Sequence, residues 1–257
     1  MTTGAPDMLG IRGRTAVVSA SSRGVGRAVA IALSRAGVNV AVNYRSSEEA
    51  AKEVVSAALA NGVKAIAVRA DVTDPEDAAM LIRRAEGSLG GVDILVNCAH
   101  GRINRAAITD SGWPDHKAQI EGALRSALNL TGAASAGMRD RGWGRIVNIG
   151  NNMVSEPVKG YSAYTSAMAS LLGFTRNLAV EAGPWGVTVN MVSTGFVVTE
   201  TMPNTTQSVR DAIKAATPLG RLAVPDDIAG AVLFFASDMG GFVTGANLSV
   251  DGGKVMS

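Results

Sequence analysis

The sequence predicts a single α/β domain over residues 1–257, with a doubly wound parallel sheet of about seven strands. Segments with strand character and segments with helical periodicity alternate from end to end, which is typical of right-handed βαβ crossovers. Apolar residues make up 47% of the chain and charged residues 18%, as expected when central strands are buried on both faces. No internal repeat, low-complexity tract or linker rich in Pro, Gly or Ser divides the chain.

The first half of the chain predicts four strands separated by three helices. Gly37 ends the first helix as a C-terminal cap, and Asn61-Gly62 ends the second. Asp74 caps the third helix, with Pro75 at its first position and acidic residues in its first turn. The expected elements are strand 15–19, helix 24–36, strand 38–42, helix 47–60, strand 63–68, a helix from residue 75, and strand 92–97.

The second half continues the alternation and adds three more strands. Residues 196–216 are less regular, with apolar ends and a polar middle, and we expect them to form a lid over a substrate. Seven strands joined by helices predict a Rossmann fold. The expected elements are a long helix 115–138, strand 145–149, helix 164–182, strand 187–192, helix 225–236 and strand 247–250.

Composition excludes several classes of function. A net charge of +2 is too small to predict binding to nucleic acid or to an anionic membrane. One cysteine, Cys98, excludes an internal disulfide and fits a reducing compartment. Residues 1–7 lack a basic start before an apolar run, and no apolar run reaches the ~20 residues of a membrane span, so we expect a cytoplasmic protein. Two histidines and one cysteine, not spaced as ligands, predict no metal site.

The turn after the first strand predicts a dinucleotide site. Its glycines, Gly24 and Gly26, let the backbone approach a pyrophosphate, and the helix that follows offers free N–H groups and a partial positive charge. The turn resembles the Thr-Gly-x-x-x-Gly-x-Gly motif of the short-chain dehydrogenase/reductase family, with the small residues Ser19 and Ala20 as a mild departure at its start. The residues expected to bind the cofactor here are Ser19, Ser21, Ser22, Arg23, Gly24, Val25 and Gly26.

The resemblance covers nearly the whole chain. Asp71, in Ala70-Asp71-Val72, matches the acidic residue that meets the adenine, and Asn97-Cys98-Ala99-His100 stands at the family's Asn-Asn-Ala-Gly motif. Gly195 and Thr199 match a Pro-Gly-x-x-x-Thr segment that closes on the nicotinamide, although Thr194 replaces the proline. Residues 243–245 and 250–253 match the C-terminal end of the family. The further cofactor contacts that the resemblance implies are Asp71, Val72, Asn97, Ala99, Gly195 and Thr199.

Two arginines favour NADP(H) over NAD(H). An acid at the end of the second strand would bind a ribose 2′-hydroxyl and repel a phosphate, but Asn43-Tyr44-Arg45-Ser46 contains none. Arg45 and Arg23 instead offer planar guanidinium groups, which donate two hydrogen bonds to a phosphate at once. We therefore expect NADP(H) as the cofactor.

Only one of the family's four catalytic positions is kept. The resemblance places Tyr164 at the tyrosine that handles the hydroxyl proton, but Met168 at the lysine that lowers the tyrosine pKa. Asn151 replaces the serine that holds the carbonyl oxygen, and Ala123 replaces the asparagine that supports a proton-relay water. Without a cation, Tyr164 should keep a pKa near the ~10 of free tyrosine, or higher if buried, and act as a proton donor rather than a base. The Asn151 amide can still donate a hydrogen bond to an oxygen.

His100 is an added candidate. It stands where the family has a glycine close to the nicotinamide ribose, and a histidine side chain can act as acid or base near neutral pH. The alternative is an ordinary loop imidazole. The predicted catalytic residues are therefore Tyr164, Asn151 and His100.

The departures leave three functions open. The first is an NADPH-dependent reductase of a ketone or activated double bond in a biosynthetic pathway, acting on a small, partly apolar substrate. The second is a non-redox acid/base enzyme, such as an isomerase, dehydratase or cyclase, on the same scaffold. The third is an NADP-binding pseudoenzyme without catalytic activity. The resemblance also implies a homotetramer or homodimer, since the helical segments 127–137 and 229–231 are rich in Ala and Gly and suit close packing.

Overall fold

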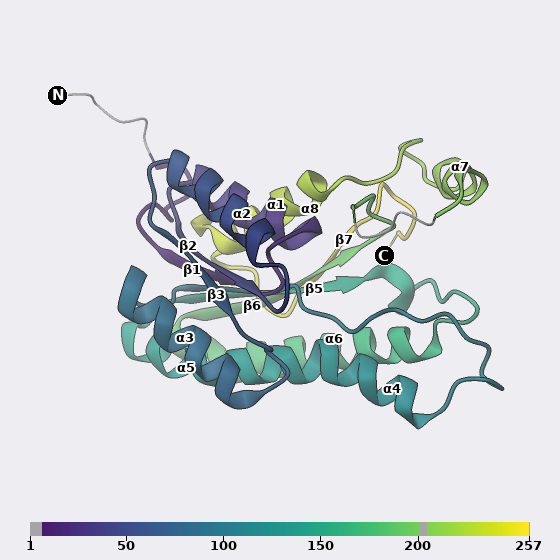
Figure 1. The fold of residues 1–257 in the computed structure, drawn as a ribbon, viewed down its shortest axis with the longest axis horizontal. Coiled ribbons are helices and arrows are strands. Elements are labelled where there is room, and N and C mark those ends of the chain that lie inside the picture. The colour runs from purple at the N-terminus through teal and green to yellow at the C-terminus, as the bar shows by residue number, and fades with distance from the viewer. Residues whose placement is uncertain (1–6, 201–204, 257) are drawn as a thin grey trace.

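The computed structural model describes residues 7–200 and 205–256, and it has the expected Rossmann architecture (Figure 1). Seven parallel strands form one sheet in the order β3-β2-β1-β4-β5-β6-β7. The order reverses between β1 and β4, and α/β sheets bind ligands beyond the carboxyl ends of the strands at such a reversal. The strands are β1 (Thr15–Val18), β2 (Asn39–Tyr44), β3 (Ala65–Arg69), β4 (Ile94–Asn97), β5 (Gly144–Asn151), β6 (Val187–Thr194) and β7 (Asn247–Val250).

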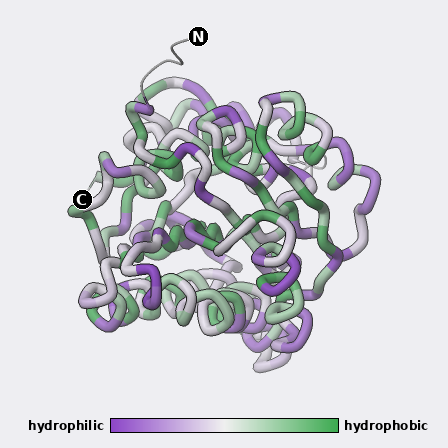
Figure 2. The backbone as a smooth tube through the Cα atoms, turned by 90° about the vertical axis from the view of Figure 1, so that its left-hand side faces the viewer, coloured by the Kyte–Doolittle hydropathy of each residue, from purple (hydrophilic) through white to green (hydrophobic). Residues whose placement is uncertain are grey.

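Helices cover both faces of the sheet. On one face lie α1 (Gly24–Arg35), α2 (Glu48–Ala60) and α8 (Pro225–Ala236), and on the other lie α3 (Pro75–Leu89), α5 (Ser126–Arg141) and α6 (Ser162–Ala182) (Figure 1). Hydrophobic and hydrophilic residues alternate along these helices (Figure 2), as expected for helices that bury one side. Each face of the sheet packs on its helices through a separate apolar cluster, so the strands are buried between two helical layers.

Several element boundaries confirm the sequence predictions. The helix 225–236 and the strand 247–250 are found as predicted. Asp74 accepts hydrogen bonds from the backbone N–H groups of Glu76 and Asp77, so it is the expected N-terminal cap of α3. The strands β5 and β6 run two residues further than predicted and end at Asn151 and Thr194.

The predicted long helix 115–138 lies within a continuous helical run over residues 113–141, which a π-helical turn divides. The structure has α4 (Trp113–Ile120), a π-helical turn (Glu121–Arg125) and then α5. Gly122, in the π-helical turn, packs directly on the backbone of Gly101 and His100, where a Cβ would lie 2.9 Å from the carbonyl carbon of His100. Widened turns of this kind are frequent at functional sites.

The stretch 196–216 is more regular than predicted, because it contains α7 (Gln207–Ala215). This short helix is amphipathic, and none of its residues is buried. Residues 201–204 of the expected lid lie outside the described residues, as do residues 1–6 of the expected leaderless N-terminus.

No helix within residues 7–200 and 205–256 is long and apolar enough to cross a membrane. Over the same ranges, no group of three or more His, Cys, Asp or Glu side chains is arranged to hold a metal ion.

Candidate active site

A cavity of ≈ 2020 Å³ opens at the carboxyl ends of the strands. It exceeds the roughly 300–1,000 Å³ of an ordinary small-molecule site, so it has room for a cofactor and a substrate together. Most of the predicted site residues line it. They are Ser22, Arg23, Gly24, Val25, Gly26, Arg45, Asp71, Val72, Ala99, His100, Asn151, Tyr164, Gly195 and Thr199, together with Met168.

The glycine-containing turn fits a pyrophosphate. A Cβ on Gly26 would lie 2.6 Å from the carbonyl oxygen of Ala20, so the turn closes only around glycine, and Gly24 has a φ of +57°. The first turn of α1 has no acidic residue of its own, and Arg23, its N-terminal cap residue, makes no side-chain capping hydrogen bond, so its N–H groups are placed to meet an anion. These features suit the phosphates of a dinucleotide.

Ala20 is a more costly departure than the sequence predicts. It has a φ of 49°, in the left-handed region that glycine adopts freely and other residues avoid. Its N–H donates to Oδ1 of Asn43 at 3.0 Å, which fixes the strained conformation. The description of this substitution as mild was therefore wrong for Ala20.

Three predicted cofactor contacts lie behind the cavity wall. Ser19, Ser21 and Asn97 are buried and do not line the cavity. The Ser19 hydroxyl accepts hydrogen bonds from the N–H groups of Cys98 and Ala99 at 2.9 and 3.1 Å. The Ser21 hydroxyl donates to Val18 O at 2.6 Å, and the Asn97 amide donates to Asn148 Oδ1 at 2.8 Å. These side chains brace the strand ends, and their predicted role in cofactor binding stays a prediction.

The two arginines stand at one end of the cavity. Arg45 Nη1 lies 3.7 Å from Asp71 Oδ2, and the Arg45 side chain is 75% exposed. Arg23 donates to the hydroxyl of Ser47, at the start of α2. Hydrogen bonds from Thr73, followed by the charge of Arg45, hold the pKa of Asp71 below its usual range. Asp71 is therefore an anion that orients Arg45 at the cavity rim.

Glu200 is a site residue that the sequence analysis missed. Its Oε1 accepts a hydrogen bond from Gly24 N at 2.8 Å, at the N-terminus of α1. This hydrogen bond, aided by the charges of Arg27 and Arg23, holds the pKa of Glu200 below its usual range despite partial burial. A carboxylate thus occupies an amide of the pyrophosphate turn, which demonstrates that this amide can serve an anion. The sequence held one signal for this contact. Glu200 is an acid that directly follows the predicted cofactor residue Thr199, and the glycine-containing turn carries Arg23 as a partner of opposite charge.

At the other end of the cavity, Tyr164 is enclosed by apolar groups. It is 7% exposed and packs in a cluster with Ala123, Ala167 and Met168. Burial raises the pKa of the Tyr164 phenol well above its usual range, which confirms the expectation from the missing lysine. Tyr164 is therefore a neutral hydrogen-bond donor at physiological pH.

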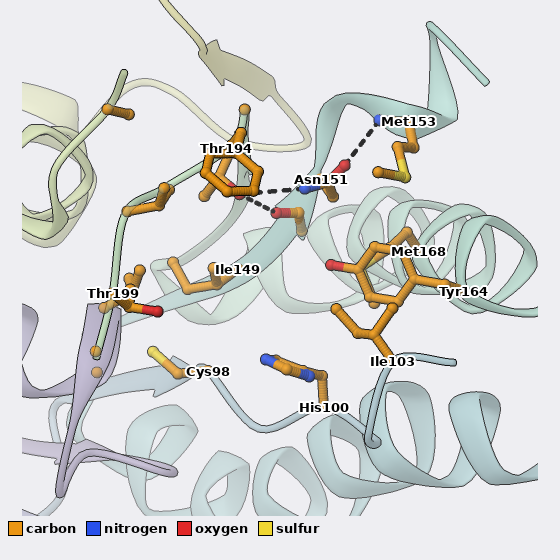
Figure 3. A pocket seen from close by; sticks show the side chains of 18 of the residues that line it. Cys98, His100, Ile103, Ile149, Asn151, Met153, Tyr164, Met168, Thr194 and Thr199 are labelled. Atoms are coloured by element: carbon orange, nitrogen blue, oxygen red, sulfur yellow. Dashed lines mark hydrogen bonds between the residues drawn. The ribbon is translucent and has the colours of Figure 1, made fainter. Parts of the chain in front are cut away.

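Asn151 and His100 face the same part of the cavity (Figure 3). Asn151 Nδ2 donates to Thr194 Oγ1 at 3.4 Å, and its Oδ1 accepts from Met153 N at 3.0 Å, which orients the amide. His100 is exposed, and its ring lies edge-on to that of Tyr164, with centroids 6.4 Å apart and an interplanar angle of 78°. Both candidates are thus brought together with Tyr164, as predicted.

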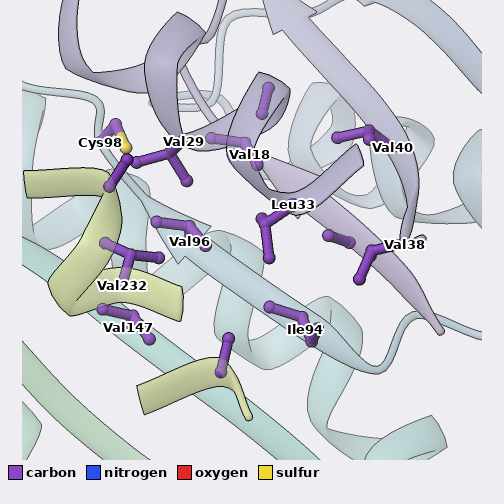
Figure 4. Close-up of a cluster of buried hydrophobic side chains, with 14 of the residues drawn as sticks. Val18, Val29, Leu33, Val38, Val40, Ile94, Val96, Cys98, Val147 and Val232 are labelled. Carbon is purple, nitrogen blue, oxygen red and sulfur yellow. The ribbon is translucent and has the colours of Figure 1, made fainter. Parts of the chain in front are cut away.

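Cys98 is a buried thiol just after β4. It sits in the apolar cluster between the sheet and α1 and α8, beside Val29 and Val96 (Figure 4). Burial raises the pKa of its thiol to about 12, so the thiol stays protonated.

Apolar side chains also line the end of the cavity that contains Tyr164, which we call the chemical end. Several of them were not identified from the sequence. They come from the loop after His100, from β5 and the turn that follows it, from the segment after β6 and from α7, which were not recognisable as neighbours in the sequence. These residues are Ile103, Ile149, Met153, Phe196, Val209 and Ile213.

Comparison with known proteins fits this architecture. A family model described as enoyl-(acyl carrier protein) reductase matches residues 19–254. Acetoacetyl-CoA reductase from Shinella zoogloeoides is 38% identical over 244 residues, which cover 94% of this chain and 98% of that protein. The chain belongs to the short-chain dehydrogenase/reductase family.

Other members of the family agree with this assignment. The 3-oxoacyl-[acyl-carrier-protein] reductase of a Synechocystis species is 36% identical and covers 97% of this chain and 100% of its own length. The solved short-chain dehydrogenase/reductase from Serratia marcescens superposes with a TM-score of 0.89 at 33% identity, covering 95% of this chain and 98% of its own. This short-chain dehydrogenase/reductase therefore has oxidoreductase relatives along its whole length.

Proposed function

We propose that this short-chain dehydrogenase/reductase is an NADPH-dependent reductase of a ketone carried on a 3-oxoacyl thioester or a similar partly apolar molecule. The observation that carries the proposal is the neutral Tyr164 phenol at the chemical end of a cavity that also contains the pyrophosphate turn. The relatives named acetoacetyl-CoA reductase and 3-oxoacyl-[acyl-carrier-protein] reductase support this substrate class and a role in biosynthesis.

The state of Tyr164 favours reduction over oxidation. Oxidation of an alcohol needs a base, and a buried phenol with a raised pKa is a poor one. Reduction needs hydrogen-bond donors at the carbonyl oxygen, where negative charge develops. The Tyr164 hydroxyl and the Asn151 amide are such donors, and both line the cavity.

The charges at the other end support NADP(H). A nicotinamide cofactor, when bound, supplies the hydride. Arg23 and Arg45 would hold a 2′-phosphate at the rim, and β2 ends at Tyr44 without an acid to repel it. Gly195 suits the nicotinamide end, because a Cβ there would lie 2.9 Å from the Cβ of Asp251 and only glycine fits.

Residues 196–216 would cover the substrate. Val209 and Ile213, one helical turn apart on α7, both line the cavity and would offer an apolar surface. A backbone bridge between Val197 and Ala223 anchors the start of the segment. This arrangement supports a partly apolar substrate.

Helix packing supports a homotetramer or homodimer. Gly132 on α5 and Gly230 on α8 have open space where a Cβ would stand, and Leu128 on α5 is 53% exposed. These positions allow close approach of a second copy, which light scattering would detect as a mass of two or four chains. A cytoplasmic location remains a prediction from the sequence.

Titration and turnover with defined ligands test the proposal. NADPH should bind at least about tenfold more tightly than NADH, a difference of ~1.4 kcal/mol. With acetoacetyl-CoA, one NADPH should be consumed for each ketone reduced. Equal binding of NADH would contradict the cofactor assignment. Conversion of the thioester without NADPH consumption would support the non-redox alternative, and binding of NADPH without any conversion would support the pseudoenzyme.

A further inference from the structure

We propose that His100 is the proton donor to the substrate oxygen, because Tyr164 is kept but the lysine that would assist it is replaced by Met168. This inference rests on the proposed reductase function. It assigns His100 as a catalytic residue and predicts that protons enter from the open side of the cavity rather than from behind Tyr164.

The hydrogen bond of the His100 ring determines which nitrogen serves the substrate. Nδ1 lies 2.8 Å from the carbonyl oxygen of Gly101. Because a carbonyl oxygen can only accept, Nδ1 carries a hydrogen, and Nε2 is the nitrogen that gains and loses a proton. The imidazole points into the cavity beside Tyr164 (Figure 3), so this exchange takes place where the substrate would bind.

The backbone around His100 is held tightly against α4. A Cβ on Gly101 would lie 2.9 Å from the carbonyl oxygen of Ala118, so only glycine allows this approach. The buried Gln119 amide donates to Arg102 O at 2.6 Å. Gly122, in the π-helical turn, packs on the other side of the same loop. Gln119 is therefore a positioning residue that fixes the loop and the direction of the imidazole.

The region behind Tyr164 offers no such route. There the phenol meets Ala123, Ala167 and Met168, all of which are nearly inaccessible to solvent and none of which can carry a proton. His100 is exposed and can be recharged from solvent after each turnover. With ring centroids 6.4 Å apart, His100 and Tyr164 can both contact one small polar group of a substrate.

The new C–H bond at the carbonyl carbon would form with a hydride and its electron pair, which a bound reduced nicotinamide dinucleotide would supply. The Nε2–H bond of the His100 imidazolium breaks, and its proton forms the O–H bond of the product. The imidazole then takes a proton from water, while Tyr164 keeps its own proton and donates a hydrogen bond throughout.

His116 provides a matched control. It is the second of the two histidines, and its Nδ1 also lies close to a carbonyl, 2.9 Å from Gly112 O. His116 does not line the cavity. In long-range ¹H–¹⁵N NMR of histidine-labelled holoprotein with NADP⁺, both rings should show a protonated Nδ1. Addition of acetoacetyl-CoA should shift Nε2 of His100 and leave Nε2 of His116 unchanged.

Single-turnover kinetics complete the test. His100→Gln should slow NADPH oxidation with acetoacetyl-CoA by at least about 100-fold, the scale of general acid catalysis, and added imidazole should restore part of the rate. NADPH affinity should not change, which also shows that the variant is folded, and His116→Gln should keep the full rate.

The inference is overturned if His100→Gln is as fast as the wild type, if Nδ1 of His100 lacks its proton, or if acetoacetyl-CoA leaves Nε2 unmoved. Failure of the proposed function has a different signature. Wild-type protein would then shift Nε2 of His100 on adding acetoacetyl-CoA, yet consume no NADPH.

Discussion

The two ends of the cavity are built from opposite kinds of residue. At the cofactor end, the backbone amides of the turn, together with Arg23 and Arg45, present polar groups to the cavity. At the chemical end, Tyr164 is embedded with Met168 and Ala123, and burial rather than a neighbouring charge determines its protonation state. A fold can keep its binding frame while its reactive groups change, because the two ends are carried by different strands and helices.

The largest effect is expected from Tyr164→Phe. Removal of the phenol hydroxyl takes away a donor to the developing oxyanion, so kcat should fall by about 10²–10³. NADPH affinity should remain within about twofold, since Tyr164 belongs to the chemical end. Stopped-flow NADPH oxidation and fluorescence titration measure the two quantities. If Tyr164→Phe kept the full kcat, Tyr164 would not be a reactive group. The division of the cavity into a cofactor end and a chemical end would then fail.

The next effect concerns the cationic rim. Arg23→Ala and Arg45→Ala should each weaken NADPH binding about tenfold, and NADH binding should change little, because only the 2′-phosphate meets these side chains. Arg84→Ala on the exposed face of α3 is the matched control and should alter neither cofactor. Equal losses for NADH and NADPH would mean that the arginines support the loop and not the phosphate.

A smaller effect is expected from Glu200→Gln. The carboxylate accepts from Gly24 N at 2.8 Å, so it competes with a cofactor phosphate for the same amide. Removal of its charge should tighten NADPH binding about fivefold, the ~1 kcal/mol scale of a charge at a helix N-terminus. Glu53→Gln, on a neighbouring acid beside Arg23 and Arg27, should leave affinity unchanged. If Glu200→Gln bound NADPH more weakly, the carboxylate would support the cofactor site and would not compete with the phosphate.

The smallest effect is on stability at the cofactor end. Ala20→Gly should relieve the left-handed backbone strain at φ 49° and raise the free energy of unfolding by about 0.5–1 kcal/mol, after the greater freedom of glycine in the unfolded chain is subtracted. Ala57→Gly, inside α2, should lower it by ~1 kcal/mol, as glycine does in an ordinary helix. Urea unfolding gives both values. A destabilised Ala20→Gly would show that the turn is not strained.

The fold followed from local patterns, whereas much of the site depended on contacts between distant segments. Periodicity, Asp74 as a cap and Gly26 in the first turn are local signals, and they gave the sheet and the phosphate-binding turn. Whether a side chain faces the cavity is set by the twist and packing of the strands. Ser19 and Ser21 therefore point away from the cavity despite their place in the motif.

Other features depend on pairs of segments that no sequence window contains. Glu200 meets Gly24 across 176 residues, and Gly122 meets the loop at Gly101 in three dimensions only. The π-helical turn between α4 and α5 follows from that contact and not from helix propensity. The apolar enclosure of Tyr164 could be predicted in part, because Met168 lies one helical turn away on α6.

Ultraviolet difference titration of tyrosine, wild type minus Tyr164→Phe, tests most directly whether the chemical end works with a neutral phenol on a retained cofactor end. With NADP⁺ bound, Tyr164 should give no tyrosinate signal below about pH 10, because burial raises its pKa above that of free tyrosine. A tyrosinate signal from Tyr164 at or below about pH 8, as a nearby cation would produce, would contradict the account.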